Sequence, residues 1–333
     1  MTEFAITEDF PKSEIEFDQR FSNIDACYEY LAQNRWPNGF ICEKCGCNAC
    51  WISSRNIYIC QKCEHQYSLT AGTIMHGTKK PINYWFKAMW WFTTRKSGVN
   101  AVNLQELLGL GSYHTAWSWL QKLRRCTIRH AREKLSGRVE VDEFFIGGKK
   151  SGKRGRGAEG KTIVLVAIER YKVQDSETLN WYWQIGRVRL QVALDCSANS
   201  LEAFINHNIE SGSTVVTDKF SSYRPVLNQG YNHVSIPPAY QKDPELGLYG
   251  AHLIASLVKR LIRSTFQGRF EPKYLQNYLD EYVFRFNRRK SKSIGKKFMR
   301  IVQQVVKSCK IRKEDIPFDL DPISEYFSLG YSG

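Results

Sequence analysis

Residues 138–146 read Arg-Val-Glu-Val-Asp-Glu-Phe-Phe-Ile, and this stretch decides the fold expected for the larger part of the chain. Side chains alternate between the two faces of a β-strand, so Val139 and Val141 share one face. Glu140 and Asp142 share the opposite face. The pattern therefore predicts a strand that carries two acidic side chains on one side.

Further strand-like runs follow this one, and helical runs follow the strands. The strand-like runs cover residues 162–169, 181–192 and 213–217. Helical patterns then extend from His252 to Lys310 and end before Pro317. Strands followed by helices predict an α/β or α+β domain of roughly 180 residues behind smaller N-terminal modules. We expect a mixed α/β fold.

A second carboxylate follows a later strand-like run, because Val215-Val216-Thr217 leads directly into Asp218. If the two strands are neighbours, Asp142 and Asp218 can approach to metal-bridging distance. A hard cation such as Mg²⁺ would then relieve their repulsion, and two such metals can support phosphoryl transfer. An Asp at a strand end is also a common turn former, so the spacing alone leaves both interpretations open.

Six of the ten cysteines lie within 22 residues: Cys42, Cys45, Cys47, Cys50, Cys60 and Cys63. Two Cys-x2-Cys pairs can supply a closed, tetrahedral four-sulfur zinc site, which is structural and is typical of a zinc ribbon. Cys42 with Cys45 and Cys60 with Cys63 are favoured, because their spacing leaves room for a β-hairpin. The middle pair of the six competes as the first knuckle. Four scattered cysteines are expected to be small core residues: Cys27, Cys126, Cys196 and Cys309.

Two short helical patterns flank Gly109-Leu110-Gly111, after a predicted aromatic-rich helix at residues 82–94. One apolar stripe follows the second pattern: Ala116, Trp119, Leu120 and Leu123. The opposite face carries basic side chains: His114, Lys122, Arg124 and Arg125. Two short helices joined by a Gly turn, the second of them basic, suit insertion into a DNA major groove. An ordinary helical hairpin is the alternative.

The charge of the chain indicates a polyanionic partner. The sequence holds 48 Lys and Arg against 33 Asp and Glu, a formal charge of +15. Seventeen basic and only three acidic residues fall between Lys259 and Lys313. Such a concentration favours nucleic acid over a merely solvated basic face. Further candidate DNA contacts lie in a Gly-rich loop and in a later basic run: Lys149, Lys150, Lys153, Arg154, Arg156, Arg288, Arg289 and Lys290.

Neither a membrane span nor a secretory signal is expected. No stretch of 18 or more apolar residues occurs. The N-terminus is acidic and lacks a basic region followed by an apolar one. We therefore expect an intracellular protein that has no membrane association.

The organisation predicted along the chain has five parts. They are a helical lead-in (1–35), a zinc ribbon (36–78), a helical DNA-binding segment with a helix-turn-helix (79–136), a catalytic domain (137–312) and a C-terminal tail (313–333).

Taken together, these motifs resemble an insertion-sequence transposase of the DDE superfamily, of the group with an N-terminal zinc ribbon and an ISXO-like transposase domain. The resemblance runs from about residue 36 to about residue 308. The segments that carry it are Cys42–Cys63, Tyr67–Thr73, Trp85–Trp90, Leu108–Tyr113, Thr115–Trp117, Val139–Gly148, Thr217–Asp218, Tyr278–Glu281 and Phe284–Arg289.

The resemblance implies a ribonuclease-H-like core in which Asp142 and Asp218 bind Mg²⁺ or Mn²⁺. It also implies a third active-site residue at the start of a helix, with a basic residue one or two turns later. His252 and Lys259 stand in these positions, whereas relatives usually have Glu, or in some cases Asn, in the first. Imidazole is a poorer ligand for Mg²⁺ than carboxylate and suits Mn²⁺ better. Asp280 and Glu281 are fallback acids.

The function implied by this resemblance is that of a prokaryotic transposase, cytoplasmic and associated with the nucleoid. It would bind the terminal inverted repeats of its element as a multimer, cut a phosphodiester and join the freed 3′-OH to target DNA. Lys259 would contact a phosphate. A catalytically impaired relic that only binds DNA is the alternative, and the His at position 252 favours it. A metal-dependent nuclease without strand transfer is a third, weaker hypothesis.

Overall fold

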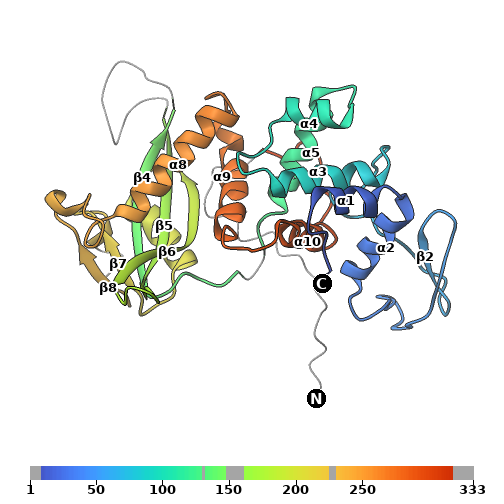
Figure 1. Cartoon of the computed structure of the whole chain (residues 1–333), viewed down its shortest axis with the longest axis horizontal. Coiled ribbons are helices and arrows are strands. Elements are labelled where there is room, and N and C mark those ends of the chain that lie inside the picture. Colours follow the sequence, from blue (N-terminus) through green and yellow to red (C-terminus); the bar gives the residue numbers. More distant parts are fainter. Residues whose placement is uncertain (1–8, 130–131, 148–160, 225–229, 318–333) are drawn as a thin grey trace. The chain divides into compact units, whose positions relative to one another are not determined.

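The computed structural model describes residues 9–129, 132–147, 161–224 and 230–317, and these divide into two compact units (Figure 1). The first, here called the helical unit, combines residues 1–129 with residues 290–316. The second, here called the sheet unit, is built on residues 130–289. Within the described residues, none of the helices combines the length and apolar character needed to cross a bilayer.

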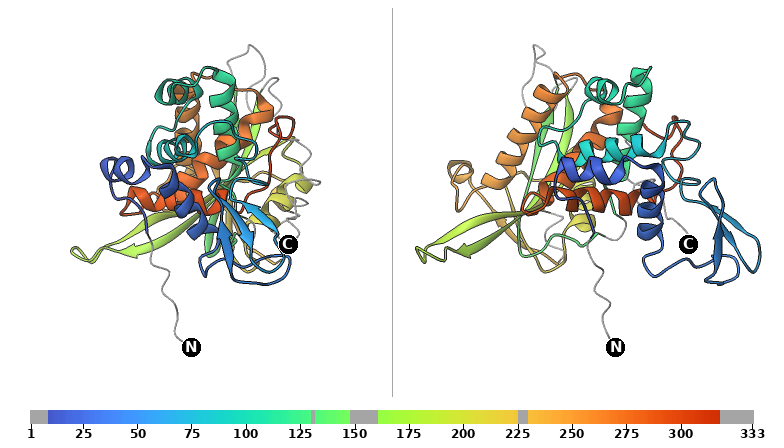
Figure 2. Two further views of the ribbon diagram at one scale, coloured as in Figure 1. Left: turned by 90° about the vertical axis from the view of Figure 1, so that its right-hand side faces the viewer. Right: turned by 45° about the vertical axis from the view of Figure 1, so that its right-hand side comes forward.

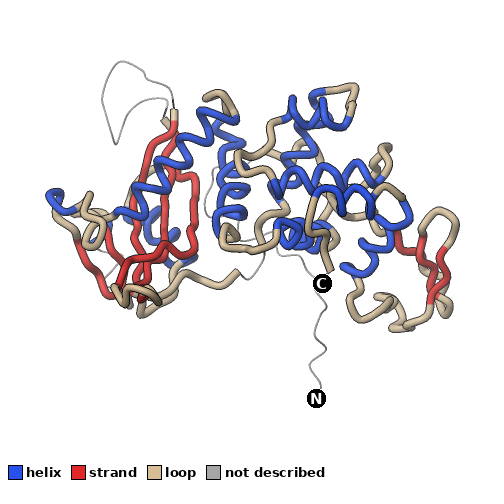
Figure 3. Tube along the Cα trace, viewed as in Figure 1, coloured by secondary structure: helices blue, strands red, loops and turns tan. Residues whose placement is uncertain are grey.

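The sheet unit contains one mixed sheet of five strands, drawn in red in Figure 3. Its strands are β4 (Arg138–Ile146), β5 (Thr162–Gln174), β6 (Trp181–Ala193), β7 (Thr214–Thr217) and β8 (Asn232–Ser235). Their order is β6-β5-β4-β7-β8. The first three are antiparallel, whereas β7 pairs in parallel with β4 and β8 with β7. The mixed α/β class is confirmed, and the arrangement is consistent with a ribonuclease-H-like core.

Each face of this sheet has its own apolar core. On one face, Val139 and Val141 pack with residues of α6 (Ala198–Asn208). The other face is covered by α8 (Tyr249–Thr265) and α9 (Pro272–Asn287). The predicted alternation along residues 138–146 is therefore confirmed.

Strands β5 and β6 extend beyond the rest of the sheet as a two-stranded hairpin, which both views in Figure 2 show. The β4 pairing ends at Arg138 opposite Arg170, while β5 continues to Gln174. Strand β5 is thus five residues longer than the predicted run at 162–169. The predicted elements also omit β8, a strand of four residues, and α6, although Leu201, Phe204 and Ile205 follow helical spacing and Ser197 caps that helix.

The helical unit is formed by helices from both ends of the chain. They are α1 (Glu14–Phe21), α2 (Ile24–Arg35), α3 (Ile82–Thr94), α4 (Ala101–Leu108), α5 (Tyr113–Arg125) and α10 (Ile294–Val305). The side chain of Phe298 on α10 is fully buried against aromatic rings from α1, α2 and α3. Residues 290–312, predicted with the catalytic domain, therefore belong to the compact unit of the N-terminal helices.

Helices α4 and α5 are the two predicted around the Gly turn. Asn100 caps α4 through its side chain, and Gly109 ends it at φ +55° in the left-handed region. The predicted stripe of α5 is buried, and its Trp119 stacks on Trp85 of α3 with ring centroids 4.0 Å apart. Gln121 and Arg124 of α5 are buried as well, and the exposed residues of the helix are Tyr113 and His114 in its first turn.

A small three-stranded antiparallel sheet completes the helical unit. It consists of β1 (Cys50–Ile52), β2 (Ile57–Cys60) and β3 (Gln66–Ser68). The predicted hairpin between the two cysteine pairs is present as β1 and β2.

Candidate active site and zinc centre

The parallel register of β4 and β7 brings the two predicted aspartates to the same level along neighbouring strands. Glu140 lies opposite Val216. Two residues further along each strand direction are Asp142, still within β4, and Asp218, immediately after β7. Both side chains are partly buried. A parallel pair in this register places two carboxylates on neighbouring strands and on the face that α8 covers.

His252 lies beside Asp142. It belongs to the first turn of α8, which begins three residues earlier than predicted, and its Nε2 is 3.3 Å from Asp142 Oδ2. The hydrogen bond with Asp142 raises the pKa of His252, and burial opposes this shift. The His252 side chain is 41% exposed, so the pair is open to solvent and to a ligand.

Lys259 lies two turns further along α8. Its Nζ is 5.5 Å from the centroid of the Phe144 ring on β4. Burial and then the neighbouring cations Arg263 and Lys161 lower its pKa, while the charge of Asp142 raises it. A shallow cavity of about 570 Å³ opens here, lined by Ser256, Lys259, Arg260, Arg263 and Ser264. The helix therefore offers a cationic groove next to the acidic strand.

Tyr223 is a site residue that the sequence patterns did not single out. It is fully buried and donates a hydrogen bond from its hydroxyl to Glu143 Oε2 at 3.0 Å. Burial raises its pKa well above the usual value, and the charges of Glu143, Asp142 and Asp218 raise it further. Tyr223 thus lies within electrostatic reach of all three carboxylates. No local sequence signal marks an isolated Tyr for this role.

A second cavity of about 320 Å³ adjoins Asp218. Its lining is mostly cationic and polar: Asp218, Lys219, Phe220, Arg224, His233 and Ser235. The His233 Nε2 lies 2.9 Å from the hydroxyl of Thr217, the last residue of β7. The edge of the sheet that carries Asp218 is therefore accessible and flanked by positive charge.

The side chains of Asp142, Asp218 and His252 are of the types that bind divalent cations, although they do not surround a single point. Two carboxylates are typical Mg²⁺ ligands, and an imidazole favours Mn²⁺. Among the described residues, Asp142, Asp218 and His252 do not form a group whose ligand atoms all lie within 4.8 Å of one another. An open site of this kind leaves room for phosphate oxygens and water.

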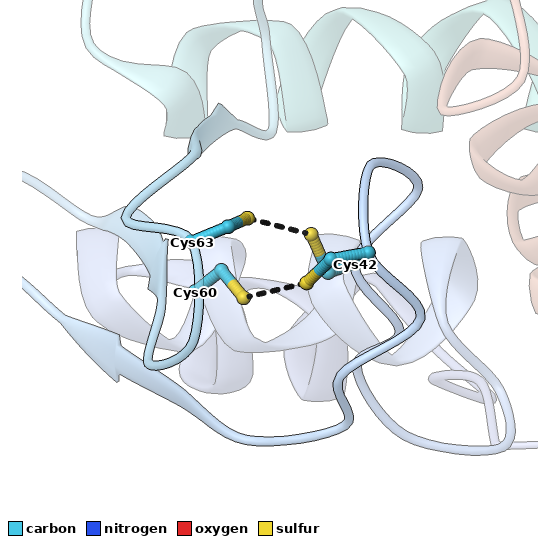
Figure 4. Close-up of side chains that lie close together, drawn as sticks. Cys42, Cys60 and Cys63 are labelled. Carbon is cyan, nitrogen blue, oxygen red and sulfur yellow. Dashed lines mark hydrogen bonds between the residues drawn. The ribbon is translucent and has the colours of Figure 1, made fainter.

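The zinc centre is more compact. Cys42, Cys45, Cys60 and Cys63 bring their sulfurs within 4.8 Å of one another, and Figure 4 shows the side chains turned together. The Sγ atoms of Cys42 and Cys63 are 3.5 Å apart, as are those of Cys45 and Cys60. Tyr67 donates from its hydroxyl to Cys42 Sγ at 3.4 Å. Four converging thiols fit a structural Zn²⁺, and the first knuckle is the predicted one.

Two family models match the chain. The ISXO2-like transposase domain matches residues 134–287, and the transposase zinc-ribbon domain matches residues 23–66. The chain belongs to the insertion-sequence transposases with an N-terminal zinc ribbon. No curated protein matches it. The transposase domain spans β4 to α9 and therefore contains Asp142, Asp218, His252 and Lys259. Domains of this kind act on DNA.

The fallback acids of this transposase have other partners. Asp280 and Glu281 are buried on α9. Asp280 accepts a hydrogen bond from Gln276, whose side chain also bonds to the backbone of β6. Glu281 pairs with Arg285 at 2.5 Å. Strand β6 is two strands away from β4 across β5, so these acids lie over a different part of the sheet.

The residues predicted to contact DNA differ in their exposure, and some of them lie outside the described residues. The prediction that Arg124 contacts DNA is wrong, because this residue is only 1% exposed and its guanidinium donates to the carbonyl of Val99 at 3.2 Å. Lys122 and Arg125 are partly exposed. Five loop residues lie outside the described residues: Lys149, Lys150, Lys153, Arg154 and Arg156.

In the basic run that follows α9, Arg288 and Arg289 make contacts within the protein, whereas Lys290 is exposed. Arg288 lies over the Phe284 ring and donates to the carbonyl of that residue. Arg289 donates to the carbonyl of Gly186 on β6, so its guanidinium fixes the end of α9 to the sheet. Lys290 is exposed. Of the four scattered cysteines, Cys27 and Cys126 are buried as expected, whereas Cys196 and Cys309 are partly exposed.

Proposed function

We propose that this transposase catalyses metal-dependent cleavage of DNA at the ends of its element and transfers the freed 3′-OH to target DNA. The observation that carries the proposal is the placement of Asp142 in β4 and of Asp218 directly after β7, the parallel neighbour of β4, with His252 against Asp142. Two carboxylates carried by neighbouring parallel strands are suited to hold Mg²⁺ or Mn²⁺ next to a phosphodiester.

Four residues near the two aspartate strands would have separate roles in cleavage. Asp142 and Asp218 would hold the cation, and His252 would complete or orient its surroundings. A bound divalent cation supplies activation of the attacking oxygen and stabilisation of the leaving oxygen. Lys259, on the same face of α8 as His252 by its seven-residue spacing, would neutralise a phosphate of the bound strand. Buried Tyr223 would hold Glu143, the residue next to Asp142, through its hydrogen bond.

DNA recognition is proposed for the helical unit. The zinc ribbon and the α4–α5 pair would bind the terminal inverted repeats, with Lys122 and Arg125 as phosphate contacts. Lys290 and the five basic residues of the predicted Gly-rich run, Lys149, Lys150, Lys153, Arg154 and Arg156, would add further contacts. Because two element ends must be joined to one target, the active form is proposed to be a homo-oligomer.

The test is an assay of cleavage and joining on duplex DNA that carries the element's ends, with Mg²⁺ and Mn²⁺ in parallel. The proposal predicts nicked ends and joined products that depend on the metal. Binding to the ends without any product, with either metal, would contradict it and would identify a DNA-binding relic. Cleavage without joining would reduce the function to a nuclease.

A further inference from the structure

Glu140 occupies an unusual place for a carboxylate, because only 1% of its surface is exposed and it lies under the first turn of α8. One carboxylate oxygen, Oε1, accepts from Arg170 Nη1 at 2.8 Å. The other, Oε2, accepts from the backbone N–H of Ala251 at 3.0 Å. Strand β4 and helix α8 are therefore joined by a buried, charged hydrogen-bond link.

This link supplies what the local sequence of α8 lacks. The residue that precedes the helix is Leu248, which offers no side-chain cap, and the first turn contains no acidic residue. The first N–H groups of a helix need acceptors, and a negative charge at this end is favourable. Glu140 provides both from a neighbouring strand, so it acts as a cap that is distant in sequence.

Gly250 makes the close approach possible. A Cβ added at this position would lie 2.9 Å from Glu140 Oε2, 3.2 Å from Ile168 Cγ2 and 3.3 Å from Arg170 Cδ. These atoms belong to buried side chains of β4 and β5 that have little room to move. Any larger residue at Gly250 would push the first turn of α8 away from the sheet.

Arg170 fixes the same region from the other side. Its side chain is 3% exposed, and its Nη2 donates to the carbonyl of Pro244 at 2.9 Å, in the loop that leads into α8. Burial raises the pKa of Glu140, and the positive charge of Arg170 opposes this shift. The loop, the helix start and the strand are thus tied to one buried pair.

The link is adjacent to the proposed catalytic contact in both elements. Asp142 follows Glu140 by two residues on the same face of β4, and His252 follows Ala251 directly in α8. We infer that Glu140 is a positioning residue, which caps α8 and thereby holds His252 against Asp142. The inference rests on the proposed function for its catalytic consequence, but its structural part can be tested separately.

The chain contains a matched control on the opposite face of the same sheet. Glu169 is also largely buried, pairs with Arg187 at 2.6 Å and accepts from the backbone N–H of Ser136. A Cβ at Gly186 would lie 2.7 Å from Glu169 Cβ. Within the described residues, the side-chain hydrogen bonds and ion pairs of Glu169 and Arg187 go to Glu133, Lys134, Ser136 and each other and none goes to α8, so equivalent substitutions there report general loss of stability.

The first measurement is hydrogen–deuterium exchange of the full-length protein, which needs no activity. In Glu140→Ala, exchange at the start of α8 should increase by about 3- to 30-fold, the range expected for loss of a helix cap. Gly250→Ala should have the same local effect. Glu140→Gln keeps an oxygen acceptor for Ala251 and should stay closer to the wild type. An unchanged α8 in Glu140→Ala and Gly250→Ala would overturn the inference, as would an equal increase in Glu169→Ala.

The second measurement is single-turnover DNA cleavage. Glu140→Ala and Gly250→Ala should lower the rate by about 10- to 100-fold, as expected when a catalytic group is displaced by about 1 Å. Half-saturation by DNA should change little, and Glu140→Gln should recover much of the rate. Glu169→Ala and Gly186→Ala should remain near the wild type. Equal losses in both groups would contradict positioning. If the wild type itself does not cleave, the proposed function fails and the exchange result alone decides the role of Glu140.

Discussion

Three carboxylates within four residues of β4 have three different partners. Glu140 caps α8, Asp142 contacts His252 and Glu143 accepts from Tyr223. The alternation of the sequence correctly predicts that Glu140 and Asp142 share a face. It does not predict their partners on α8, Ala251 and His252, because those lie more than 100 residues away and depend on which strands and helices become neighbours.

A pH effect is expected at His207, near the end of α6. Burial, and then the charges of Arg132, Lys134 and Arg189, lower its pKa to about 4. The unfolded chain, with a His pKa of about 6.5, therefore takes up a proton first as the pH falls. Stability should be lost between about pH 6.5 and 4, by at most about 1.4 kcal/mol per pH unit, and this loss should end below pH 4.

The check is His207→Gln, which stays neutral throughout this range. Unfolding of the sheet unit by urea, followed through hydrogen exchange of β5, should depend less steeply on pH in the variant than in the wild type. Parallel curves for the two proteins would show that His207 does not contribute.

At the scale of elements, several helix ends follow local rules, whereas the ends of strands and the start of α8 do not. Residues 82–94 and the Gly turn after α4 appear as predicted, because capping and apolar spacing are local properties. Strand β5 is longer than its apolar run, because its last residues pair only with β6. Helix α8 begins at Tyr249, three residues before the predicted start at His252, because its cap comes from β4.

The turn between α4 and α5 gives a sharp test of backbone strain. Gly109 has φ +55°, so Gly109→Ala should cost about 1 kcal/mol, or roughly 2–4 °C in the melting temperature of the helical unit. Gly111→Ala is the matched control, since Gly111 has no positive φ and nothing lies within 4 Å of an added Cβ. Equal melting temperatures for the two variants would refute the assigned role of Gly109.

Removal of zinc should destabilise the small sheet of β1, β2 and β3 and leave the sheet unit unchanged. The small sheet is closed by Cys42, Cys45, Cys60 and Cys63, while Trp51 and Ile52 of β1 are exposed and add no apolar burial. A strong chelator, or Cys60→Ser, should raise hydrogen exchange across residues 42–68 and leave β4 to β6 of the sheet unit protected. Exchange that rises equally in both units, or in neither, would contradict a local structural zinc site.

At the scale of the whole molecule, the helical unit is built from two ends of the chain. The order of the sequence predicts residues 290–312 as part of the catalytic domain, whereas α10 packs with α1, α2 and α3. The apolar face of α10 predicts that the helix is buried on one side. It does not predict which helices cover that side, because an apolar stripe can pack against any apolar surface. Pairing of segments more than 200 residues apart is decided by shape and packing.

Phe298 is the clearest point at which to test this pairing. Its ring centroid lies between 5.3 and 6.0 Å from those of five other aromatic residues: Phe17, Phe21, Tyr30, Phe86 and Trp90. Phe298→Ala should destabilise the helical unit by about 3–5 kcal/mol. Phe204→Ala, at a fully buried position of α6, should instead destabilise the sheet unit. Hydrogen exchange of α3 and of β5 distinguishes the two, and loss of protection only in β5 for Phe298→Ala would contradict the pairing.

The central claim is that Asp142 and Asp218 form one metal-dependent centre of DNA cleavage. Its most direct test is the single-turnover cleavage rate of Asp142→Asn and Asp218→Asn on end-bearing DNA, with Glu177→Gln, an exposed acid of the β5–β6 turn, as control. Each Asn variant should lose about 1000-fold or more in rate, while DNA binding and the control remain near the wild type. Cleavage at the wild-type rate by either variant would contradict the account.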